Sequence, residues 1–175
     1  MLKVLIGGFV IGALSVLAFH QGTIHLLYNY GNDVEALTSV IGRVQGPGWD
    51  VARAMANPPV AGLHIPQFFS AMFWGGVWGI LIAAILRWTP LPDLFTATLI
   101  GAVGCTLVAV TLVAQARGLP MYAGGDTQTL LRAGLINAAY GFGTGFLLRP
   151  LALRRVKAPP PARRAARPPP LRPQA

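Results

Sequence analysis

Long charge-free stretches alternate with polar connections along this chain. Residues 4–32, Gln67–Leu86 and Leu94–Ala116 contain no Asp, Glu, Lys or Arg. Each stretch is long enough for an α-helix to cross a bilayer core of about 30 Å, at a rise of about 1.5 Å per residue. Because a backbone in hydrocarbon must satisfy its own N–H and C=O groups, helix is the expected form.

A fourth, less apolar stretch follows at Leu130–Leu148. Arg132 lies near its start and Arg149 just beyond its end, where long side chains can reach the membrane surface. The pattern predicts an all-α membrane protein, a four-helix transmembrane bundle over residues 1–150. The predicted spans are about 4–28, 67–87, 94–116 and 130–149, with an outer loop at 33–66.

The N-terminal stretch has a second interpretation, a cleaved signal peptide. Lys3 would form a short basic region and Val4–Ala18 the apolar core. The cleavage pattern is poor, because Val16-Leu17-Ala18 lacks a small residue three positions before the cut. Cleavage would leave three spans with the C-terminal tail on the same side.

The outer loop contains a pattern of its own. Apolar residues recur at helical spacing in Val34–Val44, which predicts an amphipathic helix lying on the membrane surface or over the bundle. Gly46-Pro47-Gly48 is expected to end this helix. A second short helix is expected at Asp50–Ala56, with Asp50 as its N-cap.

Composition agrees with a lipid environment. Charged residues make up 11% of the chain, against about 25% in soluble domains. The net charge of +9 is uneven, since eight of the 14 basic residues lie from Arg149 onward. Residues 151–175 are rich in Pro, Arg and Ala, which predicts a disordered tail. The tail lacks aromatics for base stacking, so anionic lipid headgroups are expected partners rather than nucleic acid. The expected headgroup-binding residues are Arg154, Arg155, Lys157, Arg163 and Arg164.

Positive charge near the span ends predicts orientation. With four spans, Lys3, Arg87 and the basic tail fall on one side of the membrane. The tail gives this side the larger positive charge, and positive charge favours the cytoplasmic side. Both termini are therefore expected in the cytoplasm and the 33–66 loop outside.

Small residues four positions apart recur in every predicted span. Such residues share one helix face and allow close packing in lipid, where hydrophobicity alone does not hold helices together. We expect these ridges to form the helix contacts. The predicted packing residues are Gly8, Gly12, Gly75, Gly79, Gly101, Asn137, Gly141 and Gly145.

Candidate chemistry is sparse. No catalytic, nucleotide-binding or metal-binding motif occurs, so neither an enzyme nor a resident cofactor is expected. His20, His25 and His64 are weak candidates for a metal or haem. His20 and His25 are five residues apart, about 140° around a helix, so they do not share a face. The other interpretation places these imidazoles in the headgroup zone, bonded to backbone or to Gln21.

Two segments carry a family resemblance: the Phe19-His20-Gln21-Gly22 turn and FWGGVWG at Phe73–Gly79. With a proline before the second span, they resemble a group of short bacterial inner-membrane proteins with about four spans and no assigned activity. The resemblance covers residues 1–150 and implies a bacterial cytoplasmic membrane. The resemblance implies no catalytic or ligand-binding role for any residue of this chain. Its implied site is where His20 and Gln21 approach the Phe73–Gly79 face.

These features predict a non-enzymatic accessory or interaction protein of the inner membrane, with a membrane-protein partner or a second copy. One alternative is a small transporter or channel subunit, with Asn137 and the glycine ridges lining a path. A further alternative is a haem- or metal-binding redox subunit using the histidines.

Overall fold

The computed structural model describes residues 1–49, 67–151 and 153. These residues are mostly helical and form no strand, so the all-helical prediction is confirmed for them. The predicted helix at Asp50–Ala56, His64 and the basic residues of the tail lie outside the described residues.

The N-terminal stretch forms one continuous helical rod from Lys3 to Asn29. Its segments are η1 (Lys3–Gly7), α1 (Gly8–Ser15), η2 (Val16–His20) and α2 (Gln21–Asn29). In η1 and η2 the helix widens to π geometry. The backbone of His20 and Gln21 keeps right-handed helical angles, so the segment Phe19–Gly22 is helical, as the predicted span over 4–28 requires, and is not a turn.

The remaining helices have bounds close to those predicted. The second stretch is α5 (Gln67–Trp88) and the fourth is α9 (Thr127–Leu148). The third stretch alternates α-helical and π-helical segments: α6 (Asp93–Leu99), η4 (Ile100–Cys105), α7 (Thr106–Val108), η5 (Ala109–Val113) and α8 (Ala114–Ala116). The short helical turns are η3 (Gly31–Asp33), η6 (Met121–Gly125) and η7 (Arg149–Leu151).

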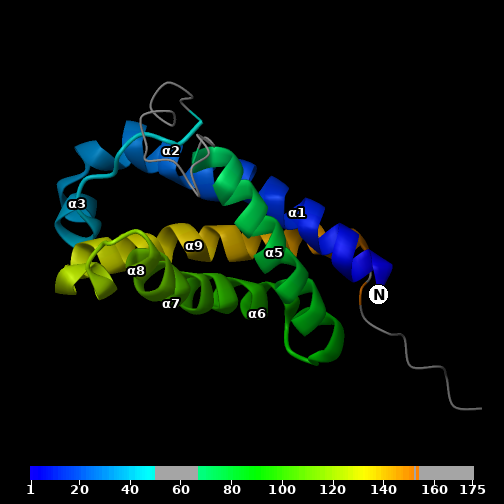
Figure 1. The fold of residues 1–175 in the computed structure, drawn as a ribbon. Helices are drawn as coiled ribbons and strands as arrows, with labels where there is room; N and C mark the ends of the chain where they lie inside the picture. The colour runs from blue at the N-terminus through cyan, green and yellow to red at the C-terminus, as the bar shows by residue number, and fades with distance from the viewer. Residues whose placement is uncertain (50–66, 152, 154–175) are drawn as a thin grey trace, which may run out of the picture.

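Figure 1 shows how these elements lie in space. The N-terminal rod crosses α5, and α6 to α8 run along α9. The N-terminus and the end of α9 lie at one end of the molecule, where Arg87 Nη1 donates to the Leu153 carbonyl at 3.2 Å. Helix α3 (Glu35–Ile41) lies at the opposite end. We call these the N-terminal end and the α3 end.

The N-terminal rod and α5 touch through glycines. A Cβ built on Gly8 would lie 2.8 Å from the Cα of Ile80, and one on Gly12 would lie 2.8 Å from the Cα of Gly79. Gly75 faces Gly12 and Val16 in the same contact. The two backbones are therefore in direct contact, and no larger residue fits between them.

The third stretch and α9 meet in the same way. A Cβ on Gly101 would lie 2.9 Å from the Cα of Gly141, and one on Gly145 would lie 2.7 Å from the Cβ of Ala97. Of the residues predicted to pack, Asn137 enters this contact through its backbone carbonyl, which faces Gly101. The ridges therefore join the helices as two pairs, first with second and third with fourth.

Tyr140 joins the two pairs. Its side chain is 3% exposed, and its hydroxyl donates a hydrogen bond to the Gly75 carbonyl of α5. Thr144, one turn further along α9, donates to the Tyr140 carbonyl at 2.9 Å. Ile82, Ala83 and residues of both pairs complete the apolar core around this bond.

Replacing Tyr140 with phenylalanine should destabilise the protein by about 0.5–2 kcal/mol, since a buried interhelical hydrogen bond is lost while the ring remains. Thermal unfolding in detergent measures the change. Tyr122→Phe is the matched control, because Tyr122 is 50% exposed. Equal melting temperatures for Tyr140→Phe and the wild type would contradict the role given to this hydroxyl.

Helix α3 is shorter than the pattern at Val34–Val44 predicts. It ends at Ile41 because Gly42 adopts a left-handed backbone with φ +68°, which favours glycine and stops the helix. The predicted stop at Gly46-Pro47-Gly48 is therefore wrong. Ile41 and Val44 are buried, whereas Val34 and Val40 are about half exposed, so only part of the predicted apolar face packs on the bundle.

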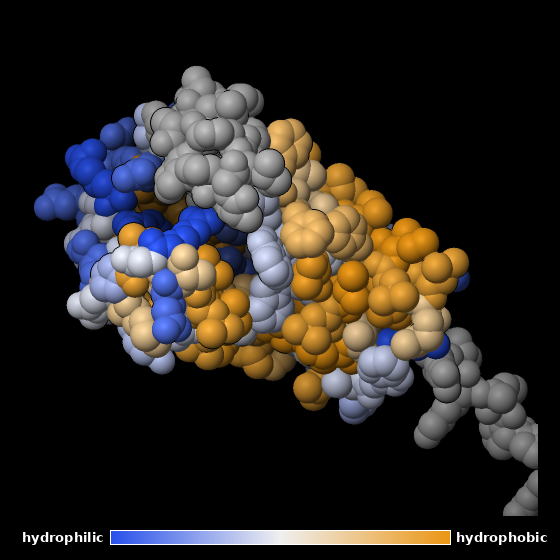
Figure 2. Space-filling model, in the orientation of Figure 1, coloured by the Kyte–Doolittle hydropathy of each residue, from blue (hydrophilic) through white to orange (hydrophobic). Residues whose placement is uncertain are grey.

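Three helical stretches of the described chain are long and apolar enough to cross a membrane: Lys3–Asp33, Phe68–Trp88 and Asp93–Ala116. Figure 2 shows apolar side chains over the middle and N-terminal end of the visible face, with polar side chains gathered at the α3 end. Helix α9 has 22 residues but is not among the three. The chain thus has the features of a membrane protein.

Candidate functional site

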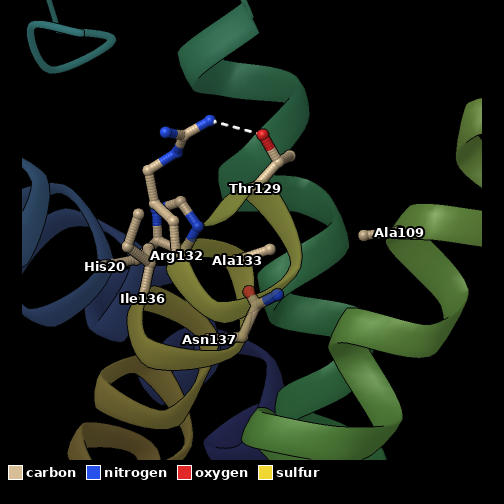
Figure 3. A pocket seen from close by; sticks show the side chains of 7 residues that line it. All are labelled: His20, Ala109, Thr129, Arg132, Ala133, Ile136 and Asn137. Carbon is tan, nitrogen blue, oxygen red and sulfur yellow. Dashed lines mark hydrogen bonds between the residues drawn. The ribbon is translucent and has the colours of Figure 1, made fainter. Parts of the chain in front are cut away.

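A cavity of about 300 Å³ lies toward the α3 end of the molecule. It is lined by residues of three helical stretches, and four of the lining side chains are polar (Figure 3). The lining residues are His20, Ala109, Thr129, Arg132, Ala133, Ile136 and Asn137. His20 ends η2 and Ala109 begins η5, so π-helical segments contribute two of the walls. Widened helical turns of this kind are frequent at functional sites.

The cavity begins where the third stretch stops touching α9. Close contact at Gly101 and Gly141 holds the two helices together in the half of the molecule nearer the N-terminal end. Further along, Asn137 Nδ2 donates to Thr106 Oγ1 at 3.0 Å, which bridges the helices through side chains. Beyond this bond, η5 packs little against α9. The small side chains of Ala109 and Ala133 then leave space.

Arg132 fastens α3 over this end of the molecule. Its Nη1 atom donates to the Ile41 carbonyl at 3.0 Å and to the Arg43 carbonyl at 3.1 Å. These carbonyls lie at the C-terminus of α3, where the helix leaves acceptors unpaired and where positive charge is favourable. Gln128 Nε2 adds a bond to the Ser39 carbonyl at 3.0 Å. The first turns of α9 therefore hold α3 in place.

Thr129 connects Arg132 to the start of α9. Its hydroxyl accepts a hydrogen bond from Arg132 Nη2 at 2.9 Å and donates one to the Asp126 carboxylate. Asp126 is the N-cap of α9 and also accepts from the Gln128 amide at 3.1 Å. The bond from Thr129 holds the pKa of the Asp126 carboxyl below its usual range, so the cap is charged at neutral pH.

Two amide side chains fasten the segment after α3. Gln21 is 5% exposed, and its Oε1 accepts from the Gly48 amide at 2.8 Å. Asn32 forms a pair of 2.8 Å hydrogen bonds with the backbone of Val44, one in each direction. Together with Arg132 and Gln128, these side chains fix the position of residues 31–49 relative to the cavity.

The candidate histidines are not brought together. His20 lines the cavity and lies 3.4 Å from the Gln21 amide nitrogen. His25 lies on the outer part of the rod, where Asn29 donates to its ring and Trp49 contacts it. Among the described residues, no group of three or more His, Cys, Asp or Glu is placed to hold a metal ion.

The site implied by the resemblance differs from the site observed. His20 faces side chains of α9 rather than the Phe73–Gly79 face, and Gln21 binds a loop amide. Phe73 and Trp74 instead lie on the outside of α5, each more than half exposed.

Sequence reasoning assigned Arg132 to the membrane surface and did not identify Thr129. The missed signal was an arginine inside an otherwise apolar stretch, which is costly in lipid and therefore marks a candidate site. Asn137 was predicted to be a helix-packing residue, and its side chain bonds to Thr106 of the neighbouring helix. Comparison of the chain with protein-family profiles, curated proteins and solved structures gives no match.

Proposed function

We propose that this chain is a non-enzymatic accessory or interaction protein of a bacterial inner membrane. The observation that supports this proposal is the set of three membrane-length apolar helices with apolar side chains on their outer surfaces. α9 serves as a fourth span, because it is 22 residues long and lies between the others. The lipid bilayer is the first partner, and a membrane protein or a second copy is the second.

The proposed topology places both termini in the cytoplasm. Lys3, Arg87 and Arg149 then lie at the cytoplasmic end, as positive charge favours. The α3 end lies outside, and the basic tail contacts anionic headgroups on the inner face. Phe73 and Trp74, exposed on α5, offer an aromatic surface to lipid or to a partner helix.

Membrane extraction and cysteine labelling test this proposal together. Cys105 is the chain's one cysteine, so a Cys105→Ala background permits single-cysteine variants. Leu119→Cys lies in the connection between α8 and α9, which is at the α3 end, Leu2→Cys lies beside the N-terminus, and both positions are exposed. We expect the protein to stay in alkali-washed membranes. A membrane-impermeant maleimide should label Leu119→Cys in intact cells and Leu2→Cys only after lysis.

Three other outcomes would each contradict a different part of this proposal. Release by alkaline carbonate would show that the chain is not an integral membrane protein. Labelling of Leu2→Cys alone in intact cells would reverse the topology. Labelling of both positions in intact cells would show that the apolar stretches between them do not place the two ends on opposite sides.

A second candidate function is that of a small transporter or channel subunit. The cavity favours it, since a cleft with polar side chains in a mostly apolar wall reaches Asn137 between two membrane-length stretches. Reconstituted liposomes should then pass a small solute, and Asn137→Leu should reduce the rate by about tenfold. Equal flux in protein-free liposomes would remove this candidate.

A further inference from the structure

The cavity contains a fixed positive charge that interacts with the Asp126 carboxylate from a distance and forms no direct ion pair with any carboxylate of the described residues. Among the described residues that line the cavity, Arg132 carries the only charged side chain, and arginine remains protonated at any physiological pH. In the part of the chain that the structure describes, its guanidinium forms no ion pair with a carboxylate. The nearest carboxylate contact runs through Thr129, whose hydroxyl stands between Arg132 and Asp126.

Arg132 also has hydrogen-bond donors that no described residue uses. A guanidinium carries five N–H donors, and the bonds to Ile41, Arg43 and Thr129 use three of them. The other two, on Nε and Nη2, have no partner among the described residues. Two donors in a planar fork match the oxygens of a phosphate or a carboxylate.

The rest of the wall restricts the ligand. A volume of about 300 Å³ is at the small end for ligand sites, so it suits a single phosphate-sized group rather than a nucleotide. Asn137 and His20 add polar contacts, while Ala109, Ala133 and Ile136 are apolar. Helices on both sides expose apolar side chains, among them Leu112 and Leu135, along which a hydrocarbon chain could lie.

We infer that this cavity binds an anionic phosphate headgroup, with the Arg132 guanidinium as its principal contact and Asn137 and His20 as polar neighbours. The inference rests on the proposed membrane location, which puts the cavity within reach of lipid. A lipid carrying a phosphate monoester is the expected source. A free phosphate ion has the same chemistry, so the test separates the two.

Binding to the full-length protein in a neutral detergent tests the inference. The probes are dioctanoyl phosphatidic acid, its zwitterionic match dioctanoyl phosphatidylcholine, and inorganic phosphate, each measured by native mass spectrometry and calorimetry. We expect saturable binding of one phosphatidic acid per chain and at least about tenfold weaker binding of phosphatidylcholine. Equal affinity for inorganic phosphate would support the anion site and assign it to a soluble ion.

Two variants locate the binding. Arg132→Gln removes the charge, but it also removes bonds to α3. Ala133→Phe is expected to fill the cavity while Arg132 keeps its bonds to α3, since Ala133 lines the cavity and takes no part in those bonds. Both should weaken phosphatidic acid binding by about tenfold or more. Arg117→Gln is the matched control, since Arg117 is an exposed arginine that does not line the cavity.

Equal binding of the anionic and zwitterionic lipids would overturn the inference, as would unchanged phosphatidic acid binding in Ala133→Phe. Melting temperatures of the variants show whether each remains folded. Failure of this inference is distinct from failure of the proposed function. If the protein stays in alkali-washed membranes but binds no anion, only the proposed anion site is contradicted. If carbonate releases the protein, the proposed membrane location is contradicted.

Discussion

Leucine in place of Gly12 is expected to lower the melting temperature of the detergent-solubilised protein by roughly 6–12 °C. An added Cβ would lie 2.8 Å from the Cα of Gly79 and closer still to the Gly75 carbonyl oxygen. These are backbone atoms, so relief requires the N-terminal rod and α5 to separate rather than a side chain to rotate. Overpacking costs about 1–3 kcal/mol where side chains can adjust, and we expect the upper end here.

Gly22→Leu is the control for this substitution. Gly22 lies in the same rod, and an added Cβ there would have nothing within 4 Å. Gly141→Leu and Gly134→Leu repeat the comparison in α9, where Gly141 faces the backbone of Ala97 and Gly134 has only the Ala102 carbonyl at 3.9 Å. If Gly12→Leu and Gly141→Leu have the same melting temperatures as their controls, these backbone contacts do not hold the bundle together.

Arg132→Gln is expected to release the segment around α3. The substitution removes hydrogen bonds to the Ile41 and Arg43 carbonyls, and bonds that involve a charged group are worth about 1.5–3 kcal/mol each. Proteolysis of a locally opened segment follows the free energy of opening. We therefore expect trypsin to cleave after Arg43 at least about tenfold faster, measured by mass spectrometry of the digest.

Gln128→Ala removes one bond, to the Ser39 carbonyl, and should give a smaller increase in the same cleavage. Arg117→Gln should give none, because Arg117 is exposed and has no bond to α3 in the described chain. Cleavage after Arg43 at the wild-type rate in Arg132→Gln would show that other contacts hold α3.

The helices themselves were predictable because a single segment in hydrocarbon can pair its backbone N–H and C=O groups only by forming a helix. The predicted spans 67–87 and 94–116 agree with α5 and the third stretch to within one residue at either end. The start of α9 lies three residues before the predicted span, because Asp126 caps it in a polar connection that hydropathy does not detect. Spacing identified the small-residue faces, but it carries no information on which helix each face meets.

Arg132 within an apolar stretch marked a candidate site, but the walls of the cavity and the contacts of Arg132 were not predictable from the sequence. Arg132 bonds to carbonyls some 90 residues earlier in the chain, and backbone carbonyls have no signature in a sequence. The end of α3 depends on the left-handed backbone of Gly42, and a glycine followed by an arginine did not distinguish this stop from the later Gly46-Pro47-Gly48. Of the residues that line the cavity, only His20 and Asn137 were predicted as site or packing residues, each for a different reason, and Arg132 was assigned to the membrane surface.

The glycine contact between the N-terminal rod and α5 has a mechanical consequence. It lies near one end of the rod, and Gly12 is about 25 Å from Asn29 at about 1.5 Å per residue. A pivot at that crossing through about 10° would swing the far end by about 4 Å, more than a hydrogen bond tolerates. At Gln21, about 14 Å from Gly12, the same pivot would move the backbone by about 2 Å, so the bond from the Gly48 amide to Gln21 opposes it together with the packing of the rod on α9.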